Sequence, residues 1–142
     1  MLEGLQAEIN AHAEFTGASN RIIMQALNKD DTAQTESWAV NDTEIKIPKG
    51  DIMAMLSLDS LGAVLTWMRA EDDVTALVFH EFYLAHERFK VTDQMFRTLI
   101  SGLETGGLIT TAEKDAVLRL GERKISRAEE LFERKLELTD FE

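Results

Sequence analysis

The sequence predicts a mainly α-helical protein, a single compact bundle of about six helices with one short β-hairpin near residues 38–47. Apolar residues recur at intervals of three and four along most of the chain, which is the period of a helix packed on one face. Residues that cap helices precede several of these segments, and the only proline is Pro48. The 142 residues, 44% of them hydrophobic, match the size of one domain, so we predict a single helical domain over 1–142.

The first predicted helix covers residues 2–28, where leucine and isoleucine recur at helical intervals. The stretch FTGASN (15–20) contains turn-forming residues, so a break near Gly17 is an open alternative to one continuous helix. Residues 29–37 are polar and form a predicted connector, which together with the hairpin occupies residues 29–50.

The β-hairpin is predicted from the stretch WAVNDTEIKIP (38–48). Trp38 and Val40 alternate with small or polar residues, Asn41-Asp42 is typical of a turn, and Ile45 and Ile47 alternate again. Because an isolated hairpin is only marginally stable in water, it must pack on the helices or add to the sheet of a partner.

The remaining chain is predicted to be helical from Asp51 to near its end. Four helix starts are expected at capping residues, namely Asp51, Asp59 or Ser60, Asp72 or Asp73, and Thr92. Val91 and Phe96 have the spacing of a hydrophobic staple, and Gly106-Gly107 is typical of a left-handed helix end. Thr110 with Glu113, and Ser126 with Glu129, have the spacing of capping boxes that begin the last two helices.

The stretch VFHEFYLAHE (78–87) raises the question of a metal site, because it contains two His-Glu pairs. On a helical wheel the core stripe is Val74, Val78, Phe82, Ala85 and Phe89, whereas His80 and His86 point about 120° apart. Two histidines six residues apart on a helix cannot bind one ion, unlike the pair four apart in zinc proteases. We therefore predict no metal site, with His80 on the solvated face and His86 packed near aromatic rings.

Other catalytic and cofactor motifs are also missing from the sequence. There is no cysteine, which excludes disulfides, zinc thiolates and thiol nucleophiles within this chain. No Gly-x-Ser-x-Gly, P-loop or Gly-x-Gly-x-x-Gly pattern occurs either. We predict a protein that is not an enzyme and needs no cofactor; an enzyme would require a cleft of carboxylates with raised pKa values.

The formal net charge is −11, and it is spread evenly along the chain. Such a charge repels phosphate backbones, so no direct nucleic-acid binding is expected. The N-terminus lacks the features of a secretory signal, and the longest apolar tract (52–68) is interrupted by polar residues. We therefore expect a soluble protein that does not bind membranes.

Candidate interface residues lie in the predicted hairpin and in the tail at 137–142. Trp38 either faces a partner, as aromatic interface residues do, or packs the hairpin onto the helices. In the tail, Leu138 and Phe141 are the apolar residues that could anchor in a neighbouring protein. The full candidate set is Trp38, Val40, Ile45, Leu138 and Phe141.

The last 36 residues, GLITTAEKDAVLRLGERKISRAEELFERKLELTDFE (107–142), resemble the C-terminal segments of small proteins encoded by tailed bacteriophages and prophages. The matching positions are Gly107, Leu108, Thr110, Ala112, Glu113, Asp115, Ala116 and Leu118, followed by Ser126, Arg127, Ala128 and Glu129. The resemblance covers about a quarter of the chain, and that family has no assigned chemistry. It implies a phage or prophage origin.

The function predicted from these observations is protein–protein docking, as a virion structural component or an assembly factor. The partners would be further copies of this chain or other virion proteins, in the virion or the cytoplasm of the bacterial host. The alternative is an acidic inhibitor that mimics DNA and occupies the nucleic-acid site of a host protein, which predicts carboxylates gathered on one face.

Overall fold

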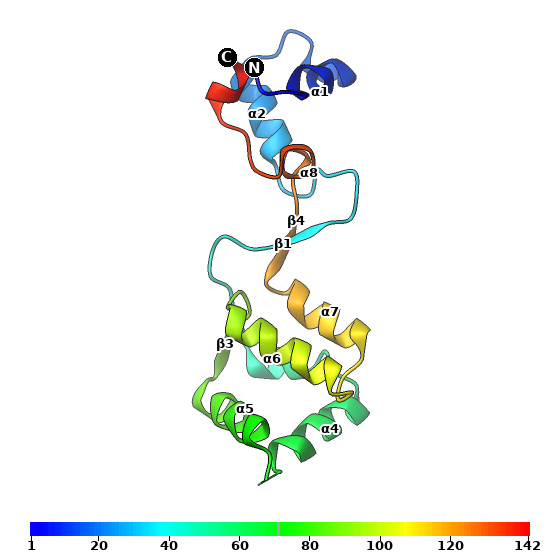
Figure 1. Ribbon diagram of the computed structural model, residues 1–142, viewed down its shortest axis with the longest axis vertical. Coiled ribbons are helices and arrows are strands. Elements are labelled where there is room, and N and C mark those ends of the chain that lie inside the picture. The colour runs from blue at the N-terminus through cyan, green and yellow to red at the C-terminus, as the bar shows by residue number, and fades with distance from the viewer. Residues whose placement is uncertain (71) are drawn as a thin grey trace. The chain divides into compact units, whose positions relative to one another are not determined.

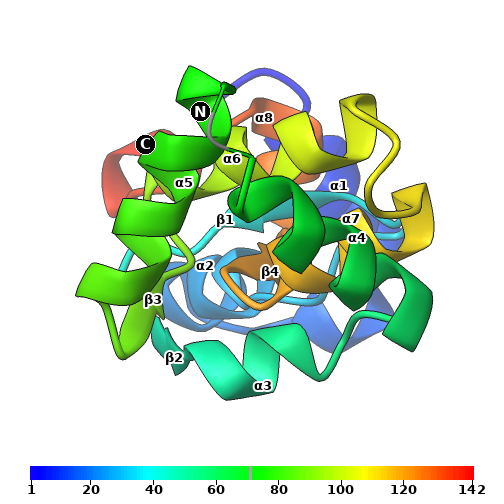
Figure 2. The same cartoon turned by 90° about the horizontal axis from the view of Figure 1, so that it is seen from below.

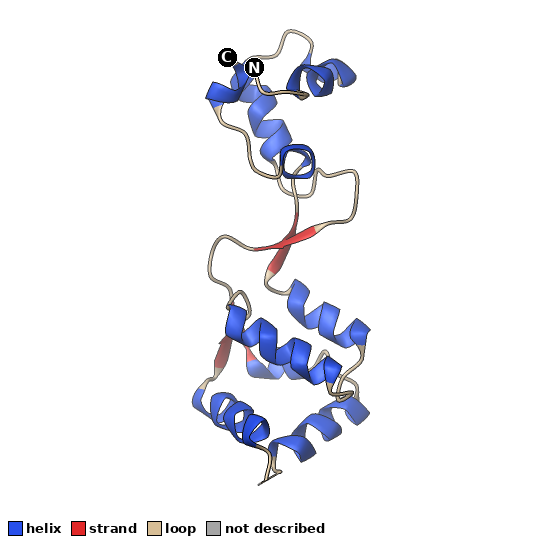
Figure 3. Ribbon diagram, in the orientation of Figure 1, coloured by secondary structure: helices blue, strands red, loops and turns tan. Residues whose placement is uncertain are grey.

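The computed structural model describes residues 1–70 and 72–142, and it is mainly helical, as predicted (Figures 1 and 3). Within the described residues there are eight α-helices, slightly more than the six expected. They are α1 (Leu5–Ala11), α2 (Asn20–Asn28), α3 (Lys49–Met53), α4 (Leu58–Met68), α5 (Val74–Ala85), α6 (Gln94–Thr105), α7 (Thr111–Arg119) and α8 (Arg127–Phe132). Short 3₁₀ helices η1 (Ala13–Phe15) and η2 (Leu138–Phe141) and strands β1 (Trp38–Val40), β2 (Lys46–Pro48), β3 (Arg88–Lys90) and β4 (Glu122–Lys124) complete the fold.

The chain forms two compact units, and one is inserted into the sequence of the other. Unit 1 consists of residues 1–39 and 123–142, and unit 2 consists of residues 40–122. Each unit has its own hydrophobic core. The single domain over residues 1–142 stays a prediction. It can be tested by measuring whether the chain unfolds in one cooperative transition.

Strands form at both arms of the expected hairpin, but their pairing with each other was predicted wrongly. β1 pairs with β4, and β2 pairs antiparallel with β3, with Ile47 opposite Phe89. The Asn41 N–H donates to the Gly121 carbonyl at 2.8 Å, and the Val91 N–H donates to the Ile45 carbonyl at 3.0 Å. Distant segments thus satisfy the backbone groups that a hairpin would have paired locally.

Unit 1 packs α1, η1, α2, α8 and η2 around a small apolar core. Its buried members are Leu5, Phe15, Ile23, Leu27, Ala128, Leu136 and Phe141. The break near Gly17 is confirmed, because Gly17 has φ +74° and α2 restarts after Ser19, whose hydroxyl accepts the Ile22 N–H. Both chain ends belong to this unit and lie near each other (Figure 1). The Leu2 N–H donates to the Asp140 carbonyl at 2.8 Å.

Unit 2 packs α3 to α7 and the β2–β3 pair around the larger core (Figure 2, in which β2 leads directly into α3). Its buried members include Ile52, Val64, Met68, Phe79, Phe89, Val91, Phe96, Ile100, Leu103, Ile109 and Val117. Among the described residues of both units, no helix is long and apolar enough to span a membrane.

The helix starts agree with the sequence where the capping signal is strongest. Asp73 caps α5, and both predicted capping boxes are present, with Thr110 and Glu113 at α7 and Ser126 and Glu129 at α8. The end of α6 at Gly106 is followed by Gly107 at φ +76°, as expected.

Three other caps were predicted wrongly by one to three positions. Ser57, rather than Asp59 or Ser60, caps α4, and Asp93, rather than Thr92, caps α6. α3 begins after Pro48, whose extended backbone ends β2, so Asp51 lies inside the first turn instead of before it. Several adjacent polar residues can cap a helix, and packing selects one of them.

Candidate interaction surface

The five predicted interface residues lie in different environments. Trp38 and Val40 on β1 and Leu138 in η2 are exposed, whereas Ile45 is half-buried and packs against the core of unit 2. Phe141 was expected to anchor in a neighbouring protein. It is only 6% exposed and instead packs in the core of unit 1.

The burial of Phe141 has a clear local cause. Arg134 donates two hydrogen bonds to the Asp140 carboxylate, at 2.9 and 2.6 Å, and the Glu137 N–H donates to the same group at 2.7 Å. The bond to Arg134 is the main cause that lowers the pKa of Asp140 to about 2. These bonds coil the tail into η2 and turn Phe141 toward its own core.

The two histidines of the VFHEFYLAHE stretch do not converge. His80 is half-buried on α5, while His86 is exposed just after it, with Nδ1 2.9 Å from the Phe82 carbonyl oxygen. The His86 ring lies 4.6 Å from the ring of Phe82, so its predicted packing near aromatic rings is confirmed. Over residues 1–70 and 72–142, no group of three or more His, Asp or Glu side chains is arranged to hold a metal ion.

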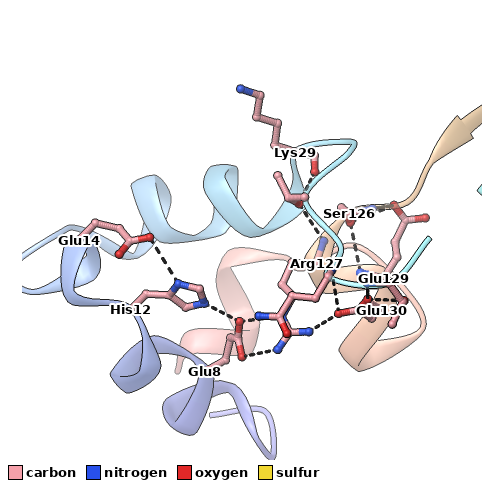
Figure 4. Close-up of polar contacts among 11 residues, drawn as sticks. Glu8, His12, Glu14, Lys29, Ser126, Arg127, Glu129 and Glu130 are labelled. Atoms are coloured by element: carbon pink, nitrogen blue, oxygen red, sulfur yellow. Dashed lines mark hydrogen bonds and ion pairs between the residues drawn. The ribbon is translucent and has the colours of Figure 1, made fainter. Parts of the chain in front are cut away.

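Unit 1 contains a charged network centred on Arg127 at the start of α8 (Figure 4). Its guanidinium donates to both carboxylate oxygens of Glu8, at 2.8 and 3.1 Å, and also to Glu130. Glu8 is buried, and on its other side Nε2 of His12 lies 2.7 Å from Oε1. The bond to Arg127 is the main cause that lowers the pKa of Glu8, and Glu8 in turn raises the pKa of Arg127.

The same network ties the polar connector to α8. The Glu130 carboxylate accepts the hydroxyl and the N–H of Thr35, at 2.5 and 2.8 Å, and these bonds hold its pKa at about 2. A cavity of about 300 Å³ lies beside the network and is lined partly by His12, Lys29 and Arg127. Because two carboxylates already occupy the Arg127 guanidinium, the arrangement is explained as a link between α1, the connector and α8. The Glu8–Arg127 pair spans 119 residues, so sequence spacing carried no signal for it.

Unit 2 exposes an apolar strip along α5, which we name the α5 strip and define as Val74, Leu77, Val78 and Leu84. These side chains are 74%, 43%, 51% and 60% exposed. Their spacing places them on one side of the helix, together with the exposed Glu81. Exposed large apolar side chains gathered on one side of a helix typically mark an interaction site.

The α5 strip corrects the core stripe expected for this helix. The buried residues of α5 are Ala76 and Phe79, whereas Val74 and Val78, which were expected in the core, are exposed. Apolar residues occur on all sides of α5, so helical periodicity did not identify the side that faces the core.

A cavity of about 340 Å³ opens between α4, α5 and α6 in unit 2 and is largely apolar. It is lined by Trp67, Thr75, Thr98, Leu99, Gly102, Leu103, Gly106 and Leu108. The indole N–H of Trp67 donates to the Asp73 carboxylate at 3.0 Å, which fixes one wall. The Ala76 N–H and then this indole bond lower the pKa of Asp73, so its carboxylate is ionised at neutral pH.

None of the protein-family models, curated proteins or solved structures compared with this chain matches it. The features of unit 2 that bear on function are the α5 strip and the cavity beside the same helix.

Proposed function

We propose that the protein is a non-enzymatic docking protein that binds a protein partner through the α5 strip. The observation that carries the proposal is the exposure of four large aliphatic side chains on one side of a 12-residue helix whose other side is packed in the core. Burying the exposed part of each contributes roughly 1 kcal/mol to association. Four such contacts on a rigid helix can form the apolar centre of an interface.

Two carboxylates with strongly lowered pKa values have structural partners. Glu129 accepts two hydrogen bonds from Arg123 and caps α8, and Glu113 caps α7. Their pKa values are lowered, each to about 2, whereas general acid–base work near neutral pH needs raised carboxyl pKa values. Each therefore has a structural role that accounts for its environment.

The biological setting that we propose is a phage or prophage, with the protein acting as a virion component or assembly factor. This part rests on the resemblance of residues 107–142 to C-terminal segments of small phage proteins. The partners would then be other virion proteins or further copies of this chain, in the virion or in the host cytoplasm.

The acidic DNA-mimic inhibitor stays the alternative prediction. Unit 1 has 12 acidic and 7 basic residues and unit 2 has 14 and 8, so their net charges are −5 and −6. The acidity is therefore divided between the units, and Arg123, Arg127 and Arg134 each bind a carboxylate in unit 1. An inhibitor of this type would lose its target as the salt concentration rises.

Site-specific photo-crosslinking tests the docking proposal. A photoreactive amino acid replaces Leu77 or Leu84 in the full chain, produced in the cells that naturally make it, and the control position is Leu58, 86% exposed on α4. We expect the same crosslinked species from positions 77 and 84 and a much lower yield from 58. Equal yields from all three positions, or no crosslinked species from 77 and 84, would refute docking through the α5 strip.

A further inference from the structure

We propose that the cavity of unit 2 receives one aromatic or aliphatic side chain of a basic partner segment, with Gly102 in its lining and the Asp73 carboxylate bound to its Trp67 wall. This inference rests on the proposed docking function and names the chemistry of the partner. The cavity and the α5 strip share α5, since Thr75 lines the cavity in the first turn of that helix.

The size and lining of the cavity fit a single large apolar side chain. Its volume of about 340 Å³ lies at the lower end of the range for ligand pockets in proteins, which begins at about 300 Å³. Leu99, Leu103 and Leu108 supply apolar walls, and the indole of Trp67 supplies an aromatic one. Polar groups are few in this lining. An apolar side chain that enters the cavity therefore separates few hydrogen-bonding groups from water.

Gly102 keeps the cavity open. It lies inside α6, where glycine is the least favoured residue after proline. A Cβ atom built at Gly102 meets nothing within 4 Å, so no close packing explains the absence of a side chain. Because Gly102 also lines the cavity, a larger residue there would occupy the space that we assign to the partner.

The negative charge of unit 2, with Asp73 beside the Trp67 wall, favours a basic partner. The Asp73 carboxylate binds the Trp67 indole at the cavity wall, and Asp72 is exposed immediately before it. Unit 2 carries a net charge of −6, so a lysine or arginine beside the inserted side chain is attracted to the unit and to the Asp73 carboxylate next to Trp67. A second copy of this chain brings the same negative charge, which disfavours self-association at this site.

Peptide binding to the full chain tests the inference. The probes are three 15-residue helical peptides: one with a single phenylalanine flanked by lysines, one with the phenylalanine replaced by alanine, and one with the lysines replaced by glutamates. Binding is measured by calorimetry and by Trp67 fluorescence in the Trp38→Phe background. Gly102→Leu fills the cavity, and Gly62→Leu is the matched control, because Gly62 also lies inside a helix with open space at its Cβ position but does not line the cavity.

We expect micromolar binding of the phenylalanine–lysine peptide and at least a tenfold loss with either altered peptide or with Gly102→Leu. Gly62→Leu should leave binding unchanged. Thr75→Phe, which blocks the cavity from α5, should repeat the loss if Gly102→Leu unfolds the chain. Equal binding of the phenylalanine–lysine peptide to wild type, Gly102→Leu and Thr75→Phe would overturn the inference. The absence of binding by any of the peptides would also overturn it. So would a cavity that neutral indole saturates and from which no peptide displaces the indole.

The two proposals fail in different ways. Crosslinking from positions 77 and 84 without binding of the phenylalanine–lysine peptide would retain the docking function and reject the cavity as its basic-segment site. Peptide binding at the cavity without crosslinking from the α5 strip would reject docking through that strip.

Discussion

Replacing Glu113 by alanine should destabilise unit 2 by more than the loss of one local helix cap. The carboxylate accepts the Thr110 N–H at 2.9 Å within its own capping box. It also accepts the Ser57 N–H at 2.7 Å and the Ser60 hydroxyl at 2.6 Å, both from the start of α4. One side chain therefore caps α7 and links it to a helix more than fifty residues earlier in the chain.

The lowered pKa of Glu113 sets the size of the expected loss in the free energy of unfolding. The Ser60 hydroxyl bond is the main cause that lowers this pKa from 4.5 to about 2. This difference corresponds to at most about 3.4 kcal/mol. Because the side chain is partly exposed, solvent screening reduces the contribution to about 1.5 kcal/mol. For a chain of this length, a loss of that size lowers the melting temperature by about 5 °C.

The stabilisation contributed by the Glu113 carboxylate should decrease as the pH falls. The pKa of Glu113 is lower in the folded protein than in the unfolded chain, so its stabilisation is complete above pH 4.5 and is lost as pH falls toward 2. Urea unfolding of wild type and Glu113→Ala, followed by circular dichroism, should show a difference that is full at pH 7 and disappears near pH 2.

Asp115→Ala is the matched control on the same helix, because Asp115 is exposed and its ion pair with Lys114, at 3.5 Å, lies on the helix surface. It should change the free energy of unfolding by less than about 0.5 kcal/mol. A Glu113→Ala effect no larger than that of Asp115→Ala, or a difference that stays constant from pH 7 to pH 2.5, would refute the assigned role of this carboxylate.

Three further predictions concern the two cores and their connection. Arg127→Ala leaves Glu8 buried without its guanidinium partner, with the His12 contact remaining, and should cost about 3 kcal/mol in urea unfolding. Most of this loss should be regained when Glu8→Leu is added, and no recovery would contradict the assignment. Gly121→Ala places a Cβ atom 2.4 Å from the Val91 carbonyl oxygen, so we expect a loss above about 3 kcal/mol or failure to fold, and a wild-type melting curve would disprove this contact. Calorimetry should give one transition if residues 1–142 unfold as a single domain, whereas two transitions, one matching the separately produced segment 40–122, would reject that prediction.

The parts of the fold that the sequence predicted are those that local chemistry controls. The two capping boxes join residues three apart, so Thr110 with Glu113 and Ser126 with Glu129 identify the same helix starts in the sequence and in the structure. Gly107 was identifiable for a similar reason, since a left-handed helix end depends on the backbone of one residue.

The parts that the sequence did not predict depend on residues far apart in the chain. Strands were expected at both arms of residues 38–48, but their partners, β4 and β3, lie about eighty and forty residues away. The second role of Glu113, toward Ser57 and Ser60, is equally non-local. Backbone hydrogen-bonding groups are alike at every residue, so only the packed core decides which segments meet.

For the candidate interaction surface, too, local properties were predictable from the sequence and burial was not. The sequence alone determined that α5 is a helix rich in apolar residues, because composition and a cap at Asp72 or Asp73 are local properties. Which side of that helix faces the core, and that Phe141 turns into its own unit, was decided only by the tertiary structure. The hydrophobic effect has no direction, and an apolar side chain is buried or exposed according to the surface that the rest of the chain presents to it.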